Sequence, residues 1–84
     1  MKRRPMVFIY MDILTVLRDG PAGPTRLART CNIPYDRLNI YVPPLLGAGF
    51  VTKSVEQERE YFRATRDGIQ WLEEMERNLK KLNL

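Results

Sequence analysis

The chain has 84 residues, of which 44% are hydrophobic and 29% are charged. That length allows one small domain with a single core, and the composition is typical of a folded protein rather than a disordered tail. With one cysteine and no histidine, an internal disulfide and the usual zinc sites are excluded. The apolar runs are shorter than the roughly 18 residues of a membrane span, so we expect a cytoplasmic protein.

The net charge of +4 is unevenly distributed along the chain. Residues 1–55 hold eight Lys or Arg and three Asp or Glu, a balance of +5, whereas residues 56–84 hold six and seven, a balance of −1. A basic excess on one part of a small domain favours a polyanionic partner, most often nucleic acid. Ordinary solubility charge is the alternative interpretation.

The first predicted element is a helix over residues 6–18, where apolar residues recur with a period near 3.6. Gly20 follows it, at the position where a helix commonly ends with a left-handed residue. Additional apolar residues such as Phe8 lie on other faces of this helix. A helix that is apolar nearly all round is buried on more than one side, which favours contact with a second copy of the chain.

Two further helices are predicted after the Gly- and Pro-rich connector at residues 20–24. One spans residues 25–31, with Thr25 as its cap and Asn32 in a left-handed turn. The next opens at Pro34, which the first turn of a helix tolerates. Because an interior proline lacks an N–H and costs about 3 kcal/mol, Pro43 and Pro44 predict a break or sharp kink after Val42.

The last third of the chain predicts a β-hairpin and a final helix. "FVTKSV" and "YFRAT" have strand-like composition, and "EQERE" makes a polar reversal between them. Thr65 is placed to cap a helix that runs to about Leu82. Apolar residues then repeat at spacings of three and four, as in a short coiled-coil seam flanked by Trp71. The seam residues are Leu72, Met75, Leu79 and Leu82.

The stretch "TRLARTCNIPYDRLNIYVPPLLGAGFV", followed by "YFRATRDGIQWLEEM", resembles the winged helix-turn-helix family. More narrowly, it looks like the small archaeal winged-helix regulators and chromatin proteins with a C-terminal dimerising helix. The positions that carry the resemblance are Thr25, Tyr35, Tyr41, Leu45, Leu46, Gly49, Phe50, Tyr61, Thr65 and Gly68. Two features depart from the pattern: the paired prolines, and an acidic wing tip where many wings carry Lys or Arg.

The resemblance implies an α+β, mostly α fold, with three helices, a two-stranded hairpin called the wing, and a C-terminal helix. It divides the chain into a basic arm (1–5), a winged helix-turn-helix domain (6–65) and a dimerisation helix (66–84). The third helix is then expected in the major groove of double-stranded DNA. The expected DNA contacts are Tyr35, Arg37 and Asn39 at base edges, Thr25, Arg26 and Arg29 at phosphates, Lys2, Arg3 and Arg4 in the arm, and Lys53 and Arg59 on the hairpin. The alternative is that these are ordinary solvated side chains.

We therefore expect a homodimeric DNA-binding transcription regulator or chromatin-type protein, associated with the nucleoid. The dimer is expected to form through residues of the first and last helices, namely Phe8, Trp71, Leu72, Met75, Leu79 and Leu82. The alternative function is a winged-helix module that docks a protein partner of the transcription machinery. An enzyme is not expected, because no histidine-containing catalytic set and no Gly-rich phosphate loop is present, and we expect no metal, cofactor or small-molecule substrate.

Overall fold

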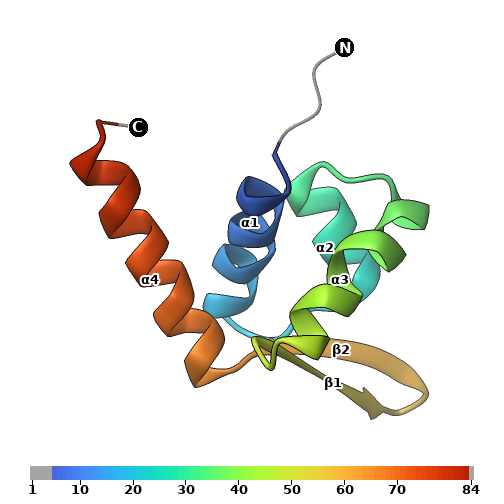
Figure 1. Ribbon diagram of the computed structural model, residues 1–84. Helices are drawn as coiled ribbons and strands as arrows, with labels where there is room; N and C mark the ends of the chain where they lie inside the picture. Colours follow the sequence, from blue (N-terminus) through green and yellow to red (C-terminus); the bar gives the residue numbers. More distant parts are fainter. Residues whose placement is uncertain (1–4, 84) are drawn as a thin grey trace.

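The computed structural model describes residues 5–83 (Figure 1). The order of elements is α1 (Met6–Arg18), α2 (Pro24–Cys31), the 3-10 turn η1 (Tyr35–Arg37), α3 (Leu38–Gly47), β1 (Val51–Glu56), β2 (Arg59–Ala64) and α4 (Arg66–Lys81). The predicted mostly helical α+β fold, with a two-stranded hairpin and a C-terminal helix, is confirmed. The predicted arm residues Lys2, Arg3 and Arg4 lie outside the described residues.

Helix α1 forms the centre of the molecule, with α4 on one side and α2 and α3 on the other (Figure 1). Its Ile13 and Leu14 are fully buried, and Leu27 of α2 and Leu72 of α4 are buried to the same degree. Three separate helices therefore contribute to one continuous core. Within residues 5–83, no helix is both long and apolar enough to cross a membrane.

Helix α2 begins one residue earlier than predicted. Pro24 occupies its first turn and Gly23 is the N-cap residue, with no side-chain capping bond. The expected capping role of Thr25 is therefore wrong, because Thr25 is the second residue of the helix, whereas a capping side chain belongs to the residue that precedes the first turn. At the other end, Asn32 adopts the predicted left-handed conformation, with φ of 57° and ψ of 48°.

Helix α3 continues through Pro43 and Pro44, so the predicted break after Val42 is wrong. Both prolines are exposed, whereas Leu38, Val42 and Leu45 are buried along the opposite side. Burial of this apolar side keeps the segment helical, although the two prolines cannot donate the usual bonds to the carbonyls four residues earlier. The irregular turn precedes the helix instead, at η1.

The hairpin pairs β1 with β2 in antiparallel register, from Val51 opposite Ala64 to Glu56 opposite Arg59. Only Gln57 and Glu58 form the turn, both at positive φ, so the strands extend further into "EQERE" than predicted. The connector between α1 and α2 also joins the hairpin. The amide N of Ala22 lies 3.1 Å from the carbonyl O of Phe62, and the N of Phe62 lies 2.8 Å from the O of Ala22.

The predicted cap of α4 is confirmed: the amide N of Gly68 donates to Thr65 Oγ1 at 3.0 Å. The same hydroxyl donates to the carbonyl oxygen of Gly49 at 2.6 Å, which attaches the helix start to the end of α3. Further along α4, Leu72 is fully buried in the core of its own chain. Its predicted place in a dimer contact is therefore wrong, because no part of it is left to touch a second copy.

Candidate nucleic-acid interface

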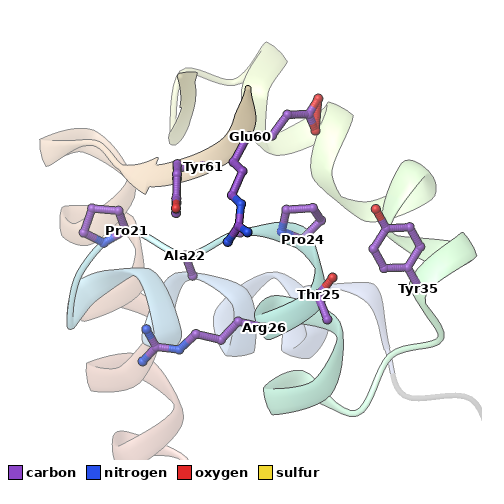
Figure 2. Close-up of a pocket in the computed structure, with 10 residues that line it drawn as sticks. Pro21, Ala22, Pro24, Thr25, Arg26, Tyr35, Glu60 and Tyr61 are labelled. Atoms are coloured by element: carbon purple, nitrogen blue, oxygen red, sulfur yellow. The ribbon is translucent and has the colours of Figure 1, made fainter. Parts of the chain in front are cut away.

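The start of α2 and strand β2 enclose an open groove of about 710 Å³ (Figure 2). Four predicted DNA contacts line this groove, although they come from three separate segments: Thr25 and Arg26 from α2, Tyr35 from η1, and Arg59 from β2. The remaining lining residues are Pro21, Ala22, Gly23, Pro24, Glu60 and Tyr61. The fold thus brings together predicted contacts that lie up to 34 positions apart in the sequence, from Thr25 to Arg59.

The first turn of α2 gives this groove a positive electrostatic character. The amide N of Leu27 donates to Gly23 O at 3.1 Å, so the amides of Thr25 and Arg26 precede the first intrahelical bond. Such amides, together with the positive end of the helix dipole, favour an anion such as phosphate. In Figure 2 the Thr25 hydroxyl points up toward Pro24, whereas the Arg26 side chain extends away from Tyr35.

A second groove, of about 470 Å³, lies between α3 and the hairpin. It contains the predicted contacts Asn39 and Lys53, together with the acidic residue Asp36. Tyr35 and Glu60 line both grooves, so the two adjoin along the hairpin. We call the two grooves together the hairpin groove. Its lining is otherwise largely apolar in the α3 part, with Leu38, Val42, Leu46 and Phe62 among the residues.

Ion pairs on the hairpin reduce its positive charge. Lys53 Nζ lies 3.8 Å from Glu60 Oε2, and Arg63 Nη2 lies 3.7 Å from Glu56 Oε1. Residues 51–64 hold three basic and three acidic side chains, a balance of zero. The attraction of this hairpin for phosphate is therefore weaker than its Lys and Arg content suggests.

Two predicted contacts, Arg29 and Arg37, are exposed but line neither groove. Arg37 ends η1, directly before α3. Sequence reasoning did not single out Glu60 or Ile40 as site residues. Glu60 lies in the middle of the hairpin groove, and Ile40 is 49% exposed on α3. The clearest signal for Glu60 was its two-residue spacing from Phe62, which puts both side chains on one face of the strand.

A separate apolar surface follows α4 and the adjoining part of α1. Trp71, Met75 and Leu79 are half-buried, and Leu82 just beyond the helix is 68% exposed. Phe8 of α1 is 37% exposed. The Trp71 ring stacks on Phe50, with centroids 5.5 Å apart, so it is held in place within its own chain. Across residues 5–83, no group of three potential metal-ligating side chains is found.

These features define a winged helix-turn-helix protein, and the chain belongs to that family, whose model matches residues 3–83. Its structure is similar to that of Sso10a-2, a DNA-binding protein from Sulfolobus solfataricus, with a TM-score of 0.76 and 25% identity. This similarity covers 96% of the present chain and 86% of Sso10a-2.

Two transcription regulators have the same fold at lower sequence identity. A PadR family regulator from Clostridium difficile matches with a TM-score of 0.84 and 13% identity, over 90% of this chain and 91% of that one. BldR from Sulfolobus solfataricus matches with a TM-score of 0.81 and 20% identity, over 89% of this chain and 56% of BldR. Sequence comparison with curated proteins finds no significant match.

Proposed function

We propose that the protein binds double-stranded DNA, as a homodimeric transcription regulator or chromatin-type protein of the nucleoid. The observation that carries the proposal is the hairpin groove, which gathers Thr25, Arg26, Tyr35 and Arg59 beside the exposed side of α3. The surrounding residues 20–47 hold three Arg and one Asp, a balance of +2. Such a basic surface beside a projecting helix favours duplex DNA as the partner.

In the proposed complex, α3 enters the major groove, as the second helix of a helix-turn-helix does in known complexes. Arg37 and Asn39 then face base edges, and Tyr35 lies at the groove wall. Thr25 and Arg26 contact phosphate through the start of α2, and Arg29 lies at the outer edge of the contact. Sso10a-2 is a DNA-binding protein, which supports extending this chemistry to the present chain.

The remaining predicted contacts have subordinate roles in the proposal. Lys53 and Arg59 approach the DNA backbone from the hairpin, and Glu60 weakens their contribution. Lys2, Arg3 and Arg4 stay a prediction, because they lie outside the described residues.

Dimerisation is proposed through the apolar surface of α4 and α1. Leu82 exposes 68% of its surface, and Met75 and Leu79 precede it at helical spacing on the same side of α4. From Met75 onward, α4 has no buried side chain within its own chain, and it leans away from α1 toward its C-terminal end (Figure 1). A second copy would cover Met75, Leu79, Leu82, Trp71 and Phe8, and it would place two α3 helices on one duplex.

A salt titration of duplex binding tests the proposal. Because each neutralised phosphate releases counterions, log affinity is expected to fall linearly with log salt, by about 0.9 per phosphate contact. Arg26→Ala and Arg37→Ala are expected to weaken binding, while Arg77→Ala on α4 serves as a control for the loss of one positive charge. Undetectable binding at low salt, or an affinity that salt does not change, would contradict the proposal.

A second candidate function is the docking of a protein partner through the same fold. The balance of zero charge on the hairpin and the absence of charged residues from α3 favour this alternative. It predicts that a folded protein fails to bind duplex DNA at low salt and retains partner binding in Arg26→Ala. Neither function involves catalysis or a cofactor.

A further inference from the structure

The side of α3 that points away from the core has an unusual composition for a helix proposed to enter DNA. The helix sequence, LNIYVPPLLG, contains no charged residue. Each residue advances about 100° around a helix, so Ile40 and Gly47 lie almost opposite the buried residues Leu38 and Val42. Ile40 is 49% exposed, and it is the one large side chain at the centre of this outward side.

Hydrogen bonding from the exposed side of α3 is confined to one residue. Asn39 is exposed and lines the hairpin groove, whereas Ile40, Pro43, Pro44 and Gly47 have no polar side-chain atoms. The outward side of Leu38–Gly47 therefore presents one amide group next to an apolar ridge. Because such a ridge forms no side-chain hydrogen bonds, it can distinguish two base pairs only if they differ in the apolar groups that they present.

The major groove contains one such apolar group, the C5-methyl of thymine. Adenine, its pairing partner, presents the N6 donor and N7 acceptor that an Asn amide can bind with two hydrogen bonds. We propose that Ile40 is a specificity-determining residue that packs against thymine methyl groups, while Asn39 binds adenine, so that α3 selects A·T base pairs. This inference rests on the proposed DNA-binding function.

The surroundings of Ile40 favour DNA over a protein as the occupant of this face. Arg37 directly precedes α3, so a basic group lies at the N-terminal end of the apolar ridge, where it can reach a phosphate. A helix is 10–12 Å wide with its side chains, which matches a major groove about 12 Å wide.

Replacing thymine by deoxyuracil tests the inference at the level of one methyl group. Affinities are measured for an alternating A·T duplex, the same duplex with dU in place of every dT, and an alternating G·C duplex. Burial of one methyl contributes about 0.8 kcal/mol, so each contacted methyl is expected to strengthen binding about fourfold relative to dU. Ile40→Ala is expected to remove the difference between dT and dU, and Asn39→Ala to reduce the preference for A·T over G·C about tenfold.

Val55→Ala is the matched control, because Val55 is an apolar hairpin residue that is 65% exposed. It should leave the dT and dU affinities unchanged relative to each other. Equal binding of dT and dU duplexes by the unmodified protein would overturn this inference while leaving DNA binding intact, and a dT preference that survives in Ile40→Ala would overturn the role of Ile40. Failure to bind any duplex at low salt would instead overturn the proposed function itself.

Discussion

Arg18 and Glu76 join the end of α1 to the second half of α4. Arg18 Nη1 lies 3.0 Å from Glu76 Oε1, and Nη2 lies 3.4 Å from Oε2. The hydrogen bonds that Arg18 donates to Glu76 raise the pKa of Arg18 above its ordinary value, so the guanidinium stays charged. The pair links the two helices at a point beyond the buried Leu72.

This pair is expected to contribute modestly to stability, because both side chains are more than a third exposed. A double-mutant cycle with Arg18→Gln and Glu76→Gln should give a coupling free energy of about 0.2–1 kcal/mol, decreasing as salt is added. Chemical denaturation of the four proteins measures it. A coupling near zero at low salt would show that the two groups do not interact in solution.

Gly68 is expected to tolerate no side chain. A Cβ at this position would overlap the carbonyl oxygen of Phe50, which is backbone and has little room to move. Gly68→Ala should therefore destabilise the domain by about 1–3 kcal/mol. Gly47→Ala is the control, since nothing lies within 4 Å of its added Cβ, and it should be stabilising by about 0.5–1 kcal/mol. Thermal melts distinguish the two, and equal melting temperatures would refute the proposed close contact.

Pro44→Ala is expected to stabilise α3. The substitution restores an N–H that can donate to the carbonyl of Ile40, and Pro44 is exposed and lines neither groove. The gain should be about 2 kcal/mol, the cost of an interior proline less the entropy that proline removes from the unfolded chain. Urea denaturation measures the change. A loss of stability would mean that the helix deviates at Pro44 and depends on the proline ring.

Leu82→Lys is expected to dissociate the proposed dimer without unfolding the chain, because Leu82 is 68% exposed within its own chain. Loss of a buried leucine contact should weaken association by about tenfold or more per protomer. Light scattering should then report the 9.9 kDa chain mass instead of twice that value. Gln70→Lys adds the same charge on the opposite side of α4 and should keep the dimer. A monomeric unmodified protein would refute dimerisation.

Glu60→Gln is expected to strengthen DNA binding. Glu60 lines both parts of the hairpin groove and lies 3.8 Å from Lys53 Nζ, so its removal deletes a repulsive charge and frees a basic one. Two unit charges about 4 Å apart interact by about 1 kcal/mol in water. Removing the repulsion between Glu60 and a phosphate should therefore raise the affinity for DNA about fivefold at low salt. Fluorescence anisotropy with labelled duplex measures it. A weaker affinity would indicate that Glu60 contacts a base, such as the cytosine amino group.

Much of the local structure could be predicted because it depends on neighbours in the sequence. The bounds of α1, the left-handed Asn32 and the Thr65 cap all follow from short-range bonding and were confirmed. The predicted break in α3 was wrong because it rested on a local effect alone, the free-energy cost of an interior proline. The burial of Leu38, Val42 and Leu45, which keeps the segment helical, depends on distant parts of the chain.

The candidate site was predicted only in part. The sequence indicated basic and aromatic residues, but it did not show that Tyr35 and Arg59 line the same groove as Arg26 while Arg29 and Arg37 do not. Nor did it reveal that Glu60 lies among them. Such proximity depends on how the hairpin packs beside α2 and α3, which the spacing of these residues along the chain does not encode.

The fold class, the order of the elements and the basic character of residues 20–47 could be predicted from the amino-acid sequence, since apolar periodicity, turn residues and charge are local properties. Which side chains lie together, and which are available to a partner, became known from the packing of the elements. Leu72 and Leu82 belong to the same apolar repeat, yet one is fully buried and the other 68% exposed. The physical reason is that burial depends on what packs opposite a residue, and for α4 that opposing surface ends before Leu82.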